Sequence, residues 1–207
     1  MPGRRHQEYG ALLSRARGGQ SVSLGELLER YRNYLYVVAR TQIDLHLSVR
    51  ASPSDIVQET FLRAARQFQS FRGDSEGELL AWLRRILARS IVNAYAHHVR
   101  SMKRDVRRDR PIRLSFASFD ESSRRIDSAL AASGTSPSAA AIEHEYSAQV
   151  ADRLAQLPKH YREVIILRNL EGLPFDKIAQ RMGKTSMAVR QLWTRAIRRL
   201  KLPDKRE

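Results

Sequence analysis

The chain has 207 residues and a formal net charge of +15, from 37 Lys and Arg residues against 22 Asp and Glu residues. A charge of this size predicts an anionic partner, which is either nucleic acid or a membrane surface. The absence of cysteine excludes disulfides, thiolate metal sites and a cysteine nucleophile. No apolar run approaches the roughly 20 residues that span a bilayer, and residues 1–19 lack the apolar core of a signal peptide. We therefore expect a soluble, cytoplasmic protein with no membrane partner.

The first part of the chain predicts one long helix after a basic segment. Residues 1–20 are weakly patterned and predict at most a short helix. Ser23 and Glu26 have the spacing of a capping box, in which each side chain accepts a hydrogen bond from the other residue's free backbone N–H. We expect the helix that follows to run from Leu24 to about Leu45.

A second helix start lies at Ser52 and Pro53. Serine is favoured at the N-cap and proline at the first helical position. The spacing of apolar residues extends this helix to about residue 68. Its buried side chains are predicted to be Ile56, Val57, Phe61, Leu62, Ala65 and Phe68.

A loop and a long helix come next. Residues 71–74 predict the loop, and Ser75 and Glu78 form a second capping box. The apolar residues that follow predict a helix from Leu79 towards Arg104.

The middle of the chain loses its helical periodicity. Residues 100–113 are strongly basic, and serine, alanine and glycine dominate from there to residue 138. Such a composition is typical of a linker. The chain is therefore predicted to be all-α, with two small helical domains at 20–108 and 137–203 joined by a flexible linker at 109–136.

Residues 158–201 predict the sequence helix, helix, tight turn, helix. The range 175–182 has helical apolar spacing, and Gly183 after it is suited to end a helix in the left-handed conformation. Thr185 or Ser186 can then cap the last helix. A short helix, a glycine turn and a basic second helix form a helix-turn-helix, whose second helix enters the major groove of DNA.

The last helix separates an apolar face from a basic one, and no acidic residue lies between Asp176 and Asp204. Arginine can pair with guanine edges and glutamine with adenine edges. The base-contacting candidates are Arg190, Gln191, Thr194 and Arg195. The phosphate-contacting candidates are Lys184, Thr185, Ser186 and Arg198. The alternative is a three-helix packing unit with a solvated basic face.

The two halves together resemble the extracytoplasmic-function group of bacterial sigma factors, small initiation subunits of RNA polymerase that keep two of the larger sigma domains. In the first half the resemblance rests on residues 55–73 and 82–100, and in the second half on residues 157–201. The segment TSPS at 135–138 is similar to sigma proteins that are abundant in planctomycetes.

The resemblance implies that the helix opened by Ser52 docks on the clamp helices of the polymerase β′ subunit. The docking residues implied are Asp55, Gln58, Glu59 and Arg63. Their spacing of three, four and eight residues places them in one stripe, which we expect to lie opposite the buried Ile56, Phe61 and Leu62. An ordinary solvated face is the alternative reading of this stripe.

The resemblance also implies that the loop at 68–78 captures a flipped base and that the next helix binds and opens the −10 promoter element. Proteins catch unstacked bases with basic grooves and planar contacts. The −10 contacts implied are Phe71, Arg72, Arg85, Arg89, Asn93, His97 and Arg100, and Arg84 is a further donor. Trp82 is interpreted as a core residue. His97 and His98 form no metal pair, because adjacent residues point apart on a helix.

We therefore expect a sigma factor that binds core RNA polymerase and directs promoter-specific transcription initiation. The resemblance implies contacts with the β′ clamp helices and the β flap, recognition of the −35 element by the second domain, and an anti-sigma factor as a further partner. No cofactor, metal ion or enzymatic activity is expected. The alternative is a dimeric helix-turn-helix regulator that binds operators, since such proteins dimerise to match two-fold sites.

Overall fold

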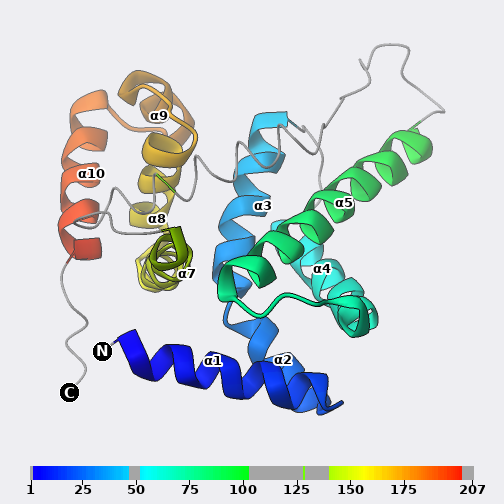
Figure 1. Ribbon diagram of the computed structural model, residues 1–207. Helices are drawn as coiled ribbons and strands as arrows, with labels where there is room; N and C mark the ends of the chain where they lie inside the picture. The colour runs from blue at the N-terminus through cyan, green and yellow to red at the C-terminus, as the bar shows by residue number, and fades with distance from the viewer. Residues whose placement is uncertain (1, 47–51, 103–127, 129–139, 202–207) are drawn as a thin grey trace. The chain divides into compact units, whose positions relative to one another are not determined.

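The computed structural model describes residues 2–46, 52–102, 128 and 140–201 (Figure 1). Every regular element in these ranges is a helix, which confirms the predicted all-α class. No helix within them is long and apolar enough to cross a bilayer.

The chain divides into two compact units, residues 1–123 and 124–207. This division agrees with the two helical domains expected from the sequence. Apart from residue 128, the predicted linker at 109–136 lies outside the described residues, as does most of the basic stretch at 100–113. The exact domain bounds, 20–108 and 137–203, remain predictions.

The first unit is helical throughout its described residues (Figure 1), and many of its apolar side chains are buried. Its elements are α1 (Pro2–Arg17), α2 (Ser21–Glu29), α3 (Arg32–His46), α4 (Pro53–Gln67), the 3₁₀ turn η1 (Phe68–Ser70) and α5 (Glu76–Met102). Helix α1 lies against α2, while α3, α4 and α5 pack on one another. Leu35, Leu80, Leu83 and Leu87 are fully buried among them, and each such side chain contributes about 1.5–3 kcal/mol to folding.

The predicted single helix from Leu24 to Leu45 is wrong, because the chain turns at Tyr31 between α2 and α3. The Tyr31 ring is buried, and its hydroxyl donates to Glu76 Oε1 at 2.7 Å. This turn brings the ring under the start of α5. Periodicity could not show the break, since both helices carry apolar residues at helical spacing.

The first predicted capping box is also wrong. Helix α2 begins at Ser21 with Gln20 as its N-cap, so Ser23 lies inside the first turn. Its side chain is buried, and its hydroxyl donates to Gln20 Oε1 at 3.2 Å rather than serving a free backbone N–H.

Helix α1 is longer than the short helix expected in residues 1–20, and it ends at Arg17, before Gly18 and Gly19. Tyr9, Leu12, Leu13 and Ala16 are buried, and their spacing of three and four residues forms one stripe. The many charged residues between them make this stripe hard to recognise from composition alone.

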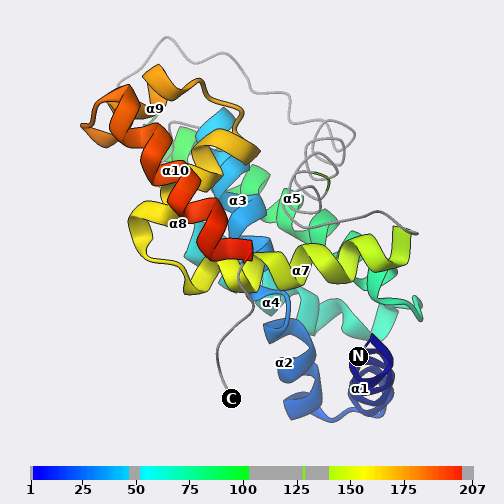
Figure 2. The same cartoon turned by 90° about the vertical axis from the view of Figure 1, so that its left-hand side faces the viewer.

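The second unit contains the predicted helix-turn-helix (Figure 2). Its elements are α7 (Ala140–Gln156), α8 (Lys159–Ile165), the π-helical turn η2 (Ile166–Leu170), α9 (Phe175–Met182) and α10 (Ser186–Lys201). Helix α10 packs on α7, α8 and α9.

The turn between α9 and α10 has the predicted geometry. Gly183 has a φ of 62°, in the left-handed region that favours glycine, and the N–H of Lys184 donates back to the carbonyl of Ala179 at 2.9 Å. Thr185 Oγ1 accepts a 3.2 Å bond from the N–H of Ala188 and caps α10.

Candidate nucleic-acid and polymerase interfaces

Helix α4 presents the predicted polar stripe to solvent. Ser52 is its N-cap and Pro53 opens it, as predicted. Asp55 and Gln58 are exposed. Glu59 and Arg63 are half-buried and form an ion pair of 2.6 Å between Glu59 Oε1 and Arg63 Nε.

The prediction that Leu62 is buried in the core is wrong, since 55% of the residue is exposed. It follows Asp55 by seven residues and Gln58 by four, so it lies within the polar stripe rather than opposite it. Ala65 is also exposed, whereas Thr60 and Ala64 are buried. The apolar residues of α4 span a wider arc than the core can cover. Thr60 enters the core by donating its hydroxyl to the carbonyl of Ile56 at 2.7 Å.

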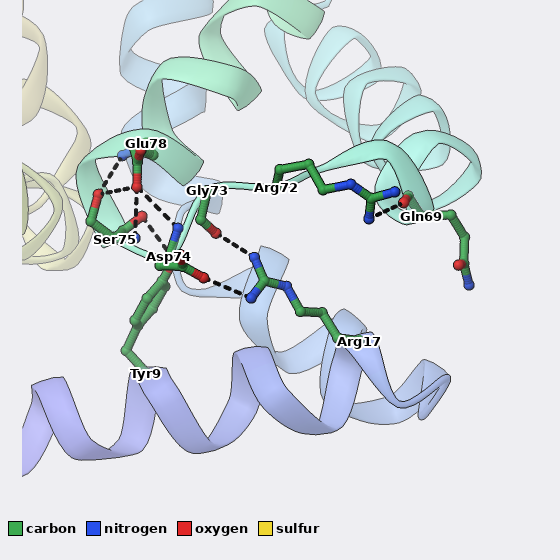
Figure 3. A network of polar contacts seen from close by, with 8 residues as sticks. All are labelled: Tyr9, Arg17, Gln69, Arg72, Gly73, Asp74, Ser75 and Glu78. Carbon is green, nitrogen blue, oxygen red and sulfur yellow. Dashed lines mark hydrogen bonds and ion pairs between the residues drawn. The ribbon is translucent and has the colours of Figure 1, made fainter.

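The second predicted capping box is confirmed at the start of α5 (Figure 3). The Glu78 carboxylate accepts bonds from the backbone N–H groups of Asp74 and Ser75, both at 3.0 Å, and from the Ser75 hydroxyl at 2.8 Å. The N–H of Glu78 donates to Ser75 Oγ at 3.2 Å. The Ser75 N–H, followed by the Ser75 hydroxyl and the Asp74 N–H, holds the pKa of Glu78 below its ordinary value. The box fixes the end of the loop at residues 71–75, which we call the capture loop after the role that the resemblance implies.

The inner side of the capture loop is closed by aromatic rings. Phe71 packs against Trp82 with ring centroids 5.1 Å apart, and Phe68 lies 6.0 Å from Phe71 and 6.2 Å from Trp82. Phe71 is 6% exposed. Its ring therefore supports the loop from inside, and the DNA contact expected of Phe71 stays a prediction. Trp82, interpreted as a core residue, is half-buried, and these rings cover one side of it.

The Arg72 side chain extends from the capture loop towards Gln69 (Figure 3). Its side chain is exposed, and it donates to the carbonyl of Gln69 at 3.1 Å. Of the two loop residues predicted to contact DNA, only Arg72 is open to a nucleic acid.

Helix α5 presents Arg85, Arg89 and Asn93 on one exposed face, since they are four residues apart. Arg84 is not on this face: it is 6% exposed, and its Nη1 donates to the Tyr34 hydroxyl at 2.9 Å. The prediction that Arg84 is a donor to DNA is wrong, because a shift of one residue turns the side chain towards α3. The side chains of His97 and Arg100 lie outside the described residues.

The outer face of α10 carries the predicted base-contacting residues. The exposed side chains are Arg190, Gln191, Thr194, Arg195 and Arg198. The opposite face buries Val189, Ala196 and Leu200. The predicted separation of a basic face from an apolar one is therefore confirmed.

Phe175 holds this helix in place against α9. Its ring lies edge-on to Trp193 with centroids 5.8 Å apart, and the Arg190 guanidinium carbon lies 5.1 Å from its centroid. The Trp193 indole N–H donates to Asn169 Oδ1 at 2.9 Å. The Phe175 ring and the Trp193 hydrogen bond hold α10 in place. They therefore fix the position from which the Arg190 side chain extends.

The predicted phosphate contacts at the start of α10 differ in their surroundings. Lys184 and Thr185 are exposed, although Thr185 already serves as the cap. The Ser186 hydroxyl donates to Asp176 Oδ1. A carboxylate beside this hydroxyl repels a phosphate, so Ser186 is poorly placed for the predicted contact.

One exposed residue on this face was not predicted from the sequence. Met187 is 70% exposed and precedes Arg190, Gln191 and Thr194 by three, four and seven residues. It therefore lies in the middle of the candidate base-contacting face. For both Met187 and Leu62, the sequence signal of exposure was an apolar residue at a position surrounded by polar residues on the same helix face.

Two regions of one protein family match the chain. Residues 27–101 match the family model for sigma-70 region 2, and residues 147–200 match the one for sigma-70 region 4. The first region covers α3, α4, the capture loop and most of α5, and the second covers the helix-turn-helix.

The chain is also similar to named sigma factors. It is 29% identical over 196 residues to the ECF RNA polymerase sigma factor BldN of Streptomyces coelicolor, which covers 93% of this chain and 65% of that protein. It is 28% identical over 172 residues to the ECF RNA polymerase sigma-E factor of Haemophilus influenzae, covering 83% and 82%. A solved structure of CnrH in complex with the cytosolic domain of CnrY covers 93% of this chain and 94% of that one, with 23% identity and a TM-score of 0.36.

Regions 2 and 4 of the family together cover more than half of the chain, in the order expected from the sequence. The relatives that match over most of its length are ECF sigma factors. The chain therefore belongs to the sigma-70 family of RNA polymerase sigma factors and is of the ECF type.

Proposed function

We propose that this chain binds core RNA polymerase and directs transcription from promoters that its two units recognise separately. One observation carries the proposal: each family region presents a solvent-exposed face of DNA-binding character on one helix, α5 in the first unit and α10 in the second. A net charge of +15 favours such contacts with DNA.

Core polymerase docking is assigned to α4. The exposed stripe around Asp55, Gln58 and Glu59 suits a polar protein interface, and Leu62 supplies an apolar centre. The partner proposed is the clamp helices of the β′ subunit, with the β flap as the partner of the second unit. Family membership further suggests an anti-sigma factor, which would silence the chain by competing for these faces. The planctomycete-like character of residues 135–138 remains a prediction.

The −10 element is assigned to the capture loop and α5. Arg72 is exposed on the loop. The helix that follows carries the exposed residues Arg85, Arg89 and Asn93. A line of cations next to a loop is what a protein needs to hold a strand while one base leaves the stack. His97 and Arg100 extend the same series by sequence.

The −35 element is assigned to α10, whose Arg190 and Gln191 are in the best place for base edges. Met187 adds an apolar contact suited to a thymine methyl group. Strand opening draws on binding energy alone, and phosphodiester chemistry belongs to the polymerase. We therefore propose that the chain itself is not an enzyme.

The test is co-migration of the purified chain with sigma-free bacterial core RNA polymerase on a sizing column. Stoichiometric co-migration, followed by promoter-dependent transcripts from the reconstituted enzyme, is the expected result. If the chain ignores the core enzyme and binds duplex DNA as a dimer, the operator-binding regulator is the better account.

Replacing Arg190 with alanine is expected to relax base preference at one position of the −35 element. The loss should be about 1–3 kcal/mol at the preferred base and much smaller at the other bases, because a bidentate arginine pair is specific to guanine. Competition binding with duplexes that vary one base pair at a time measures it.

Arg199 provides the matched control for charge, since it is exposed on α10 but follows Arg190 by nine residues and so lies on a different face. Arg199→Ala should weaken all sequences equally, if at all. If Arg190→Ala also weakens binding to all sequences equally, Arg190 contacts a phosphate and not a base.

A further inference from the structure

Helix α1 has no part in the function proposed so far. It ends at Arg17, before the matched region begins at residue 27. Its buried stripe accounts for its packing on α2, but not for two polar side chains that reach the capture loop. These are Tyr9 and Arg17 (Figure 3).

Arg17 binds the loop with both ends of its guanidinium group. Its Nη1 donates to Asp74 Oδ1 at 2.8 Å, and its Nη2 donates to the carbonyl of Gly73 at 2.7 Å. The guanidinium carbon also lies 6.0 Å from the centroid of the Phe71 ring. A planar fork with two acceptors fixes orientation as well as distance, so Arg17 sets the direction of two successive residues.

Tyr9 holds the next residue. Its hydroxyl donates to the carbonyl of Ser75 at 2.9 Å, and its ring is buried on the stripe of α1. Burial, followed by the charge of Glu76, raises the pKa of Tyr9 above its ordinary value, so the hydroxyl stays protonated and remains a donor. Together the two side chains bind residues 73, 74 and 75 without a gap.

These contacts leave another side of the loop open. Arg72 and Gln69 are exposed, and the Arg72 side chain extends towards Gln69 rather than towards α1 (Figure 3). The loop is therefore held on one side, while the side assigned to DNA is free to receive it.

These contacts are poorly suited to stabilising the fold as a whole. The side chains of Arg17 and Asp74 are 38% and 84% exposed, and an ion pair this exposed contributes little to stability. Their effect is local: they fix a loop that would otherwise lose conformational freedom when it binds. Preorganisation of this kind strengthens binding by removing that cost in advance.

We propose that Arg17 and Tyr9 are positioning residues that hold the capture loop in the shape that receives an unstacked promoter base. This inference rests on the proposed −10 function of the loop. Helix α1 thereby becomes part of the promoter-opening machinery.

The test measures base unstacking by the reconstituted holoenzyme. The probe is the duplex that wild-type holoenzyme selects from a pool with a randomised −10 region, resynthesised with 2-aminopurine at each adenine in turn. Fluorescence of 2-aminopurine rises when the base leaves the stack. Arg17→Ala is expected to slow this rise roughly tenfold, and Arg17→Lys and Tyr9→Phe to slow it less, because each keeps part of the contact.

Arg30, the C-cap of α2, supplies a matched control because its partner Glu8 lies on α1. Its Nη2 pairs with Glu8 Oε2 at 3.0 Å, so Arg30→Ala also breaks an exposed ion pair of α1 but leaves the capture loop untouched. It should open the probe at the wild-type rate. Core binding and thermal unfolding should be close to wild type for all four variants.

Two results would overturn the positioning role. Either Arg17→Ala opens the probe as fast as wild type, or Arg30→Ala slows opening as much as Arg17→Ala does, which would reduce α1 to general support. A wild-type holoenzyme that gives no fluorescence rise at any adenine would instead overturn the −10 function of the loop, and this inference with it.

Discussion

Replacing Leu62 with aspartate is expected to abolish stoichiometric co-migration with core RNA polymerase and to leave DNA binding by α10 unchanged. Leu62 is the apolar centre of an exposed polar stripe, which is where the residues that dominate binding energy are found in protein interfaces. Loss of such a residue costs about 2 kcal/mol or more, which corresponds to roughly a 30-fold weaker complex. The new carboxylate adds the cost of burying an unpaired charge.

The same exposure makes the variant easy to interpret. A side chain already more than half in solvent contributes little to the core, and surface substitutions of this kind change stability by about 0.5 kcal/mol or less. The variant should therefore unfold at the wild-type temperature, so loss of co-migration would report on the interface alone.

Val22 is the matched control, because it is 73% exposed on α2 and outside the stripe of α4. Val22→Asp introduces the same charge in the same unit and should co-migrate normally. Equal loss in both variants would point to a general effect of charge, and full binding by Leu62→Asp would remove α4 from the docking surface.

The charged members of the stripe should behave differently from its centre. Asp55 is exposed, and Glu59 is already paired with Arg63. Truncating a charge at the rim of an interface changes the rate of association and its salt dependence more than the lifetime of the complex. The sequence predicted the exposed polar residues of this stripe but not Leu62 among them.

Local signals in the sequence were sufficient where the structure is determined locally. Ser52 and Pro53 start α4, Gly183 ends α9, and Glu78 closes the box with Ser75. Each of these features involves residues within five positions of one another. The helix-turn-helix was predictable for the same reason.

The features that sequence could not give depend on contacts between distant residues. The chain turns at Tyr31 within a helical pattern, and the Tyr31 hydroxyl donates to Glu76, 45 residues later. Arg17 binds Asp74 across 57 residues, and nothing near either one indicates the pair. The resemblance implied a DNA contact for Phe71, yet its ring packs against Trp82 on the next helix.

Replacing Gly73 with alanine is expected to distort the capture loop and to lower the melting temperature of the chain. An ideal Cβ at residue 73 would lie 2.7 Å from both Glu78 Cβ and Phe71 Cζ, closer than such atoms approach. Neither neighbour can move away easily, because Glu78 is fixed by the capping box and the Phe71 ring is packed against Trp82. The backbone must shift instead, at about 1–3 kcal/mol, and each kcal/mol lowers the melting temperature of a domain this size by roughly 4–8 °C.

The same substitution at Gly25 should have the opposite sign. Gly25 lies within α2, and a Cβ there would meet nothing within 4 Å, so alanine should stabilise the helix by about 0.4–1 kcal/mol. Thermal melting followed by circular dichroism distinguishes the two variants. A Gly73→Ala chain that melts at the wild-type temperature would show that the loop accommodates the extra methyl group without distortion.

The promoter-opening assay tests the effect of the same substitution on function. If the loop must keep its shape to receive a base, Gly73→Ala should open the 2-aminopurine probe slowly even at temperatures where the chain is fully folded.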